Sequence, residues 1–238
     1  MFKEIDSQDT PLGIISLRLR TEPRLNNKEL YEVKLGEEFL MSSLFTEAEE
    51  QLSKLGLAAL NQPEISVVVG GLGLGYTAVT ALEDPRVTEL QVVDVMAPVI
   101  RWHQEELVPL GKTLSDDQRC QLVHGDFFAL PLKQGHAYDG TENKQVDAVL
   151  LDIDHSPSRW LNLGNSEFYS KRGLEGIADK LVDGGVFGLW SDDLPDQAFI
   201  DLLDSVFEKT EAHIIEFENP YTGNNASNSV YLSFKRPS

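Results

Sequence analysis

Residues 67–78 read VVVGGLGLGYTA, a run of valines that leads into a glycine-rich segment. The valines predict a buried strand, and Thr77–Leu82 are expected to form the helix that follows it. Glycines between a strand and a helix let the backbone approach a ligand closely and leave the N-terminal amides of the helix available. A tight turn would explain one or two glycines but not four in six positions. These are Gly70, Gly71, Gly73 and Gly75.

The chain after Pro63 alternates between short apolar runs and helical patterns. The runs show little alternation of polar and apolar residues, as in strands that are covered on both faces. The predicted strands are 65–70, 88–94, 120–126, 146–152 and 185–191, and the predicted helices are 77–82, 98–107, 166–181 and 195–207. This order predicts an α/β fold with a doubly wound parallel sheet. Two last strands, 212–219 and 229–235, are separated only by turn residues and should pair antiparallel.

The N-terminal part has a different pattern. Residues 12–20 alternate partly as a strand does, and 30–43 predict two short strands joined around Gly36, so a small antiparallel β unit is expected. Residues 47–60 have leucines at helical spacing, and Thr46 with Glu49 forms a capping-box pattern. We therefore expect two domains, a β unit at 1–45 and an α/β domain at 46–238. The acidic run TEAEEQ (46–51) is interpreted as solvated surface.

Composition limits the possible functions. Twenty Lys and Arg against 39 Asp and Glu give the 238-residue chain a formal charge of -19, which disfavours binding to nucleic acid or anionic membranes. The apolar fraction of 41% is enough for a folded core. No stretch has the length and apolarity of a signal peptide or a membrane span, so a cytoplasmic location is expected.

Acidic residues follow the predicted strands at the carboxyl edge of the sheet, where open α/β folds bind ligands. Asp94 ends the second strand, at the distance from the glycines at which nucleotide folds place an acid for ribose hydroxyls; capping a helix before Pro98 is the alternative. The fourth strand leads into LLDIDHSPSRW (150–160), which carries Asp152, Asp154 and His155. Two acids and a histidine at this edge predict contact with substrate, and Trp160 could line its entrance.

Five α/β units closed by a hairpin resemble the class I S-adenosylmethionine-dependent methyltransferase fold, a seven-stranded sheet whose last strand is antiparallel. The N-terminal β unit is similar to that of spermidine synthases. The G-x-G-x-G spacing resembles the nucleoside site of that fold, whereas a nicotinamide fingerprint would need glycine at Tyr76. The resemblance implies that the glycines bind the nucleoside, that Asp126 accepts a hydrogen bond from the adenine amino group, and that the backbone amide of Phe127 faces the adenine ring.

The resemblance to spermidine synthases also implies a reaction. Asp152 matches the acid that orients and deprotonates the attacking amine, and the position of a second family acid is His155. We expect a transferase, with S-adenosylmethionine or its decarboxylated form as co-substrate, that moves a methyl or aminopropyl group to a small, cationic amine. Asp152 or His155 would accept the proton. A homodimer is implied by the family.

Two departures from the family leave other functions open. Spermidine synthases carry an acid in the glycine loop, where Leu74 stands, and a Tyr-His-Glu segment that is missing here. A catalytically inactive nucleoside-binding homologue is therefore the first alternative. The second is a metal-assisted O-methyltransferase, in which Asp192 and Asp193 would join Asp152 around a divalent cation. Because either of these two acids could instead cap a helix near Pro195, we expect no metal site.

Overall fold

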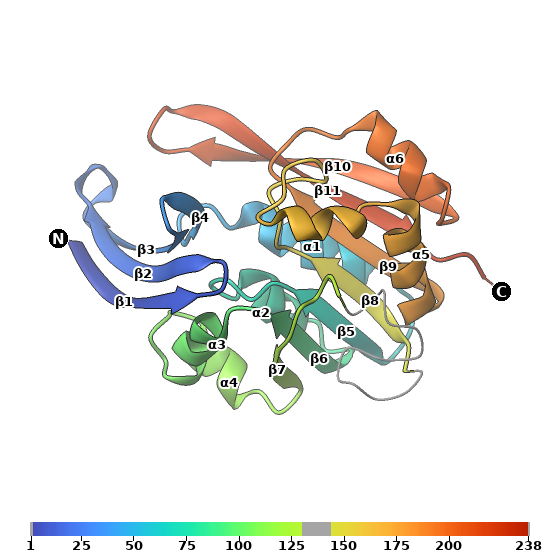
Figure 1. Cartoon of the computed structure of the whole chain (residues 1–238), viewed down its shortest axis with the longest axis horizontal. Coiled ribbons are helices and arrows are strands. Elements are labelled where there is room, and N and C mark those ends of the chain that lie inside the picture. Colours follow the sequence, from blue (N-terminus) through green and yellow to red (C-terminus); the bar gives the residue numbers. More distant parts are fainter. Residues whose placement is uncertain (1, 130–143, 238) are drawn as a thin grey trace.

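The computed structural model describes residues 2–129 and 144–237 and contains a small N-terminal sheet and a large central sheet (Figure 1). The N-terminal sheet is antiparallel, with neighbouring strands consecutive in the chain. Its strands are β1 (Phe2–Thr10), β2 (Gly13–Glu22), β3 (Lys28–Leu35) and β4 (Glu38–Ser42). The sequence did not predict β1, because FKEIDSQDT is polar and mostly exposed and lacks an alternating apolar face.

The central sheet has the order β10-β11-β9-β8-β5-β6-β7. Its strands are β5 (Ile65–Gly70), β6 (Val87–Asp94), β7 (Cys120–His124), β8 (Val146–Leu151), β9 (Leu181–Ser191), β10 (Lys209–Asn219) and β11 (Asn224–Phe234). Strands β5 to β9 run parallel, whereas β11 is antiparallel to both β9 and β10. This topology confirms the predicted seven-stranded sheet with an antiparallel last strand.

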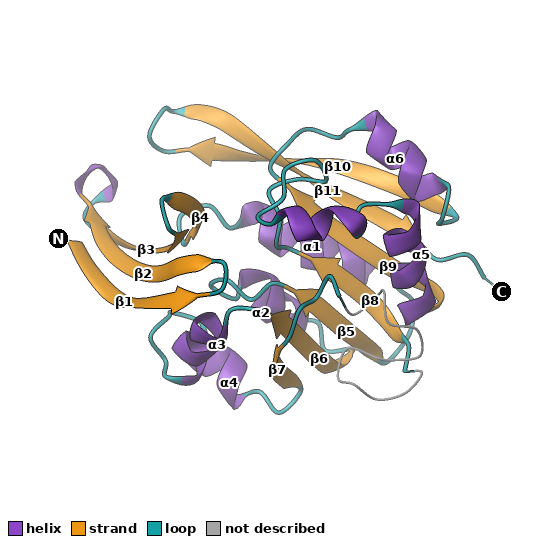
Figure 2. Cartoon of the chain, viewed as in Figure 1, coloured by secondary structure: helices purple, strands orange, loops and turns teal. Residues whose placement is uncertain are grey.

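Helices cover both faces of the central sheet (Figure 2). They are α1 (Glu47–Ala58), α2 (Tyr76–Glu83), α3 (Ala97–Gln104), α4 (Gly111–Asp116), α5 (Lys171–Lys180) and α6 (Gln197–Asp204), with short 3-10 helices at Pro23–Leu25 and Leu163–Glu167. The predicted helix 166–181 is shorter than expected because Ser170 starts α5 by accepting a hydrogen bond from the amide of Gly173. Within the described ranges, no helix is long and apolar enough to cross a membrane.

Successive side chains along each central strand point to opposite faces of the sheet, so the core has two layers. Val67 and Val69 on β5 pack with α1 to α4, whereas Val68, between them, packs with α5 and α6 on the opposite face. All three side chains are almost fully buried, as expected for a parallel strand covered on both faces. The first layer also contains residues of the N-terminal sheet, such as Ile15 and Val33, so the two sheets share a continuous core.

Polar contacts fix the N-terminal sheet against the rest of the molecule. The Asp6 carboxylate on β1 accepts hydrogen bonds from Trp102 Nε1 at 2.7 Å and Arg101 Nη2 at 2.6 Å, both on α3. At the other side of the sheet, Arg20 donates to the Tyr221 hydroxyl of the β10–β11 hairpin at 2.8 Å. These contacts close the sheet over the edge at which β5, β6 and β8 end. The division into domains at residue 45 stays a prediction.

The glycine loop after β5 reaches the end of β8. Gly71 has φ +95°, and a Cβ built on it would lie 2.1 Å from the carbonyl oxygen of Asp152. The amide of Asp152 also donates to the Gly70 carbonyl at 2.8 Å. Only glycine fits at position 71, because any side chain would combine an unfavourable φ with overlap of backbone atoms.

We predict that Gly71→Ala lowers the free energy of unfolding by about 3 kcal/mol or more, since backbone overlap adds to the cost of a left-handed conformation. Gly36→Ala is the matched control, because Gly36 has φ +58° with nothing within 4 Å of its built Cβ. The control should cost about 1–2 kcal/mol. Urea denaturation measures both, and equal losses would contradict the proposed close approach.

Candidate active site

A cavity of about 510 Å³ lies between the carboxyl edge of the central sheet and the N-terminal sheet. The glycine loop and the ends of β6 and β8 form one side, and β2 to β4 form another. The β10–β11 hairpin adds a wall through Phe217, which packs against Phe45 with ring centroids 5.6 Å apart. Seven predicted site residues line the cavity: Gly71, Gly73, Asp94, Asp126, Phe127, Asp152 and His155.

Only two of the four glycines predicted to bind the nucleoside, Gly71 and Gly73, line the cavity. Gly70 and Gly75 do not line the cavity: a built Cβ on Gly70 would meet the Phe127 ring at 2.7 Å, and one on Gly75 would meet Leu114 and His103. Leu74, at the position expected for the family's acid, is fully buried in the core. The loop therefore brings no carboxylate into the cavity.

His103 supports the glycine loop from beneath, a role the sequence did not suggest. It is fully buried on α3, and its Nε2 lies 3.0 Å from the carbonyl oxygen of Gly73. Burial lowers the pKa of His103, which favours a neutral ring that donates through Nε2.

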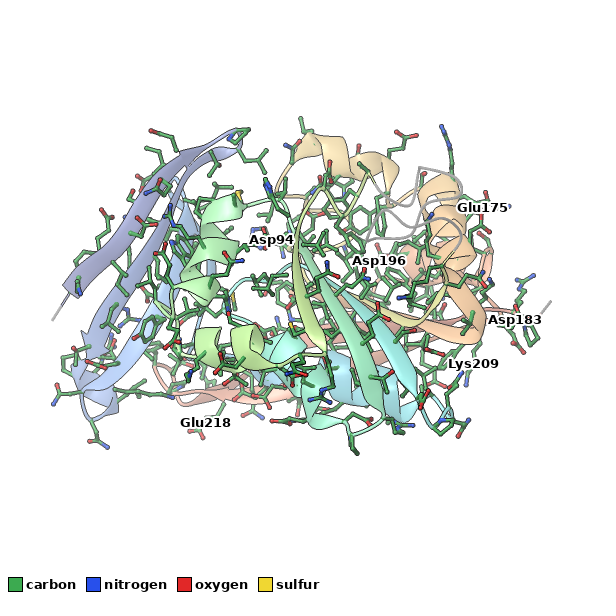
Figure 3. All side chains as sticks on the ribbon, turned by 90° about the horizontal axis from the view of Figure 1, so that it is seen from below. Asp94, Glu175, Asp183, Asp196, Lys209 and Glu218 are labelled. Atoms are coloured by element: carbon green, nitrogen blue, oxygen red, sulfur yellow. The ribbon has the colours of Figure 1, made fainter. Side chains whose placement is uncertain are left out.

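Asp94 connects the end of β6 to the glycine loop and lies in the interior, on the side of the N-terminal sheet (Figure 3). Its two carboxylate oxygens accept hydrogen bonds from the amides of Leu72 at 2.9 Å and Met96 at 2.7 Å. Burial raises the pKa of Asp94, and these amides oppose the shift. Helix α3 begins at Ala97 without a side-chain cap, so the alternative of Asp94 as its N-cap is wrong. Each oxygen keeps a lone pair that could accept from a ribose hydroxyl.

Asp126 and Phe127 follow β7 at the neighbouring position of the same edge. One Asp126 oxygen accepts hydrogen bonds from the amides of Phe128 at 3.0 Å and Ala129 at 3.3 Å. The second oxygen can accept from an exocyclic amine. The Phe127 ring is 2% exposed and packs tilted against Phe168, which fixes the backbone at this position.

Asp152 lies directly after β8, and its Oδ2 accepts a hydrogen bond from the Thr77 hydroxyl at 2.7 Å. Thr77 belongs to the first turn of α2, so the residue that follows the glycine loop orients this carboxylate. Burial raises the pKa of Asp152 to about 6, and the bond from Thr77 opposes the shift only in part. A carboxylate with this pKa is a stronger base than an exposed one.

Glu49 is a site residue that the sequence interpretation missed. It lines the cavity and is only 9% exposed, so assigning the whole 46–51 run to solvated surface is wrong for this residue. The capping box is wrong too, because the Thr46 hydroxyl accepts no hydrogen bond from the helix amides and instead donates to the Glu50 carboxylate at 3.1 Å. A signal existed: Glu49 precedes the buried Leu52 and Ser53 by three and four residues, on one helix face. Burial, and then the charge of Asp152, raise the pKa of Glu49 well above its ordinary value.

Two predicted substrate residues do not line the cavity. Asp154 is 2% exposed, and its carboxylate accepts hydrogen bonds from the Leu161 amide at 2.7 Å, Asn165 Nδ2 at 2.9 Å and the Tyr169 hydroxyl at 2.9 Å. It thus organises the segment after β8. Trp160 donates from Nε1 to the Pro157 carbonyl at 2.8 Å and stacks on Tyr169. Both residues hold the loop that supports the site.

His155 connects the two sheets at the cavity wall. Its Nε2 lies 2.8 Å from Glu38 Oε1 on β4, and its carbonyl accepts a hydrogen bond from the Asp192 amide at 2.7 Å. The residue at the position of the family's second acid therefore pairs with an acid from the N-terminal sheet.

The acids after β9 are arranged as ion-pair partners. Arg159 Nη2 lies 3.1 Å from Asp192 and 2.8 Å from Asp193. Helix α6 is capped by Asp196, which accepts from the Ala198 amide, so capping by Asp192 or Asp193 is wrong. Among the residues that the structure describes, no group of three or more His, Cys, Asp or Glu is placed to hold a metal ion.

Solved structures with the same architecture include spermidine synthases. One was crystallised with the transition-state analogue AdoDATO; its TM-score is 0.75 at 17% identity, and the match covers 99% of this chain and 75% of that one. Spermidine synthase from Thermotoga maritima matches with a TM-score of 0.73 at 16% identity, over 99% of this chain and 73% of that one. The chain thus has the spermidine synthase fold, within the class I methyltransferase-like group.

Sequence comparison gives related proteins. Polyamine aminopropyltransferase 2 of Pseudomonas aeruginosa is 26% identical over 174 residues, which cover 69% of this chain and 45% of that protein. Polyamine aminopropyltransferase of Sulfolobus acidocaldarius is 32% identical over 117 residues, 48% of this chain and 35% of that protein. The chain thus spans less than half the length of the curated relatives it matches. No protein-family model matches it. In fold the chain is similar to spermidine synthases, and in sequence it is similar to polyamine aminopropyltransferases.

The raised pKa of Asp152 predicts how stability depends on pH. The folded state keeps this proton up to a pKa of about 6, whereas the unfolded chain releases it near 3.8, so this group's contribution to stability is lost as pH rises through that window. In Asp152→Asn this position carries no titrating carboxyl group, so the variant does not lose stability for this reason as the pH rises. We expect the unfolding free energy of the variant, relative to wild type, to rise by about 2–3 kcal/mol between pH 4 and 7. Urea titrations measure it, with the exposed-acid variant Glu29→Gln as control for one lost charge. A pH-independent difference for Asp152→Asn would contradict the assignment.

Proposed function

We propose that the chain is an enzyme that transfers the aminopropyl group of decarboxylated S-adenosylmethionine to a small cationic amine. The observation that carries the proposal is the cavity in which the glycine loop, Asp94, Asp126 and Asp152 meet at one edge of the sheet. The polyamine aminopropyltransferases among its relatives favour aminopropyl over methyl transfer. Homodimer formation and a cytoplasmic location stay predictions from the sequence.

The residues of the cavity fit a nucleoside. Gly71 and Gly73 line the cavity, so their backbone would lie against the ligand, while the space of their missing side chains is taken by the Asp152 carbonyl and by Met41. Asp94 would accept hydrogen bonds from ribose hydroxyls, and the second oxygen of Asp126 would accept from the adenine amine. The fixed backbone at Phe127 would place its amide toward the ring.

The chemistry needs positioning and one proton acceptor. A sulfonium group activates the attached carbon for attack, so the protein has to align the amine and remove its proton. Asp152 would accept this proton, since it is oriented by Thr77 and has a pKa raised to about 6. The His155–Glu38 pair would contact the distal part of the acceptor, because His155 lines the same cavity.

Two observations bear on the alternatives. Leu74 is buried, so the glycine loop supplies no acid for the tail of the donor. This observation favours the alternative of a catalytically inactive homologue. Against it, Asp152 lines the cavity and accepts one hydrogen bond, from Thr77, so its carboxylate keeps acceptor capacity for a substrate. The ion pairs of Arg159 with Asp192 and Asp193 argue against a cation site built from these acids.

Nucleoside binding is the first test. Methylthioadenosine at 100 times its dissociation constant should stabilise the folded state by about 2.7 kcal/mol and raise the melting temperature by about 5–10 °C. Asp94→Asn should weaken this binding about tenfold or more, because one acceptor oxygen is lost to an amide nitrogen. Differential scanning fluorimetry measures both; a folded sample without any shift would refute nucleoside binding.

Turnover is the second test. Labelled S-adenosylmethionine and its decarboxylated form are incubated with a panel of diamines, and we expect transfer from the decarboxylated donor only. Asp152→Asn should lower the rate at least about 100-fold while it spares methylthioadenosine binding, because a base contributes 10²–10⁴-fold. Binding without turnover on any amine would favour the inactive homologue, and methyl transfer would contradict the aminopropyl assignment.

A further inference from the structure

Glu49 and Asp152 face the same cavity from different elements, α1 and the end of β8. Glu49 is 9% exposed, and besides its own backbone amide no partner of its carboxylate is found among the described residues. Asp152 accepts only from the Thr77 hydroxyl. Within residues 2–129 and 144–237, no Lys, Arg or His forms an ion pair with either side chain. Two buried carboxyl groups therefore lack a cation.

Other charged groups nearby do not supply that cation. The groups that act on Glu49 electrostatically are Asp152, Glu47, Glu50 and, on α2, Tyr76. Lys54, the base on this helix, pairs with Glu50 at 2.8 Å. At the wall, His155 pairs with Glu38 and Arg159 pairs with Asp192. In the part of the chain that the structure describes, these bases are thus paired with acids other than Glu49 and Asp152.

Two neighbouring buried carboxylates do not both stay charged without compensation. Either they retain a proton between them, or a cation from outside neutralises them. The raised pKa values of Asp152 and Glu49, both caused first by burial, agree with a retained proton in the empty cavity. The two groups titrate as a pair, so the proton belongs to both. A protonated amine could take its place, because an ammonium donates up to three hydrogen bonds.

We propose that Glu49 and Asp152 form a two-carboxyl subsite that binds the reacting ammonium group of the acceptor amine and releases the retained proton to solvent as it does so. The inference deepens the proposed function and rests on it. It makes Glu49, on α1, a specificity-determining residue for the acceptor. The subsite selects cationic amines over neutral molecules of the same size, since only a cation compensates both carboxylates.

The test is isothermal titration of the methylthioadenosine-saturated protein with 1,4-diaminobutane near pH 7, in phosphate and in Tris. Different ionisation enthalpies of the buffers report the number of protons released. We expect wild type to release close to one proton per bound diamine, and 1,4-butanediol not to bind. Glu49→Gln should lose most of the release and bind the diamine at least about tenfold more weakly. Glu47→Gln, an acid on the same helix, should behave as wild type.

The outcomes separate the subsite from the proposed function. Diamine binding without proton release in wild type, or unchanged release in Glu49→Gln, overturns the subsite while nucleoside binding still supports the function. Absence of diamine binding to the nucleoside-saturated protein also overturns it. If methylthioadenosine does not bind to wild type, the proposed function itself fails. Should Glu49→Gln not fold, as judged by lost methylthioadenosine binding, proton release by wild type alone decides.

Discussion

The close approach of the glycine loop to the end of β8 is the constraint on which the site depends. Gly71, at φ +95°, lies against the Asp152 carbonyl, and the Asp152 amide bonds to Gly70. Because β5 and β8 are neighbours in the sheet, this contact holds the start of α2 beside the acid that follows β8. Thr77 then reaches Asp152 at 2.7 Å. Backbone geometry at one glycine thus sets the orientation of the proposed base.

Burial acts differently on four acids in and beside the cavity. Asp154 accepts hydrogen bonds from three donors of its own loop and supports structure, although burial still raises its pKa. Asp94 is compensated by the backbone amides of Leu72, Met96 and Gly73 and lines the cavity. Asp152, with Glu49, has the least compensation and the clearest need for a ligand. The degree of compensation, rather than the position after a strand, distinguishes a structural acid from one available for binding and chemistry.

Local pattern predicted most of the fold and part of the site. The central strands were predictable because continuous apolar runs are typical of strands covered on both faces. Strand β1 was not, since its stability comes from pairing with β2 and from the bonds of Asp6 to α3 rather than from an apolar face. Asp94, Asp126 and Asp152 were predictable because acids after parallel strands gather at one edge. Glu49 was not, because a helical acid is usually solvated and its partner is about a hundred residues away in the sequence.

The sequence by itself determined the class of fold, the glycine loop after β5 and the edge of the sheet at which the predicted acids gather, because these follow from local periodicity and from strand order. Only the tertiary structure decided which acids face the cavity. Asp154 turns into its own loop, His155 pairs with Glu38 of the N-terminal sheet, and Glu49 lines the same cavity as Asp152. The physical reason is that a carboxylate's role depends on burial and on the donors around it, and these come from segments far apart in the chain.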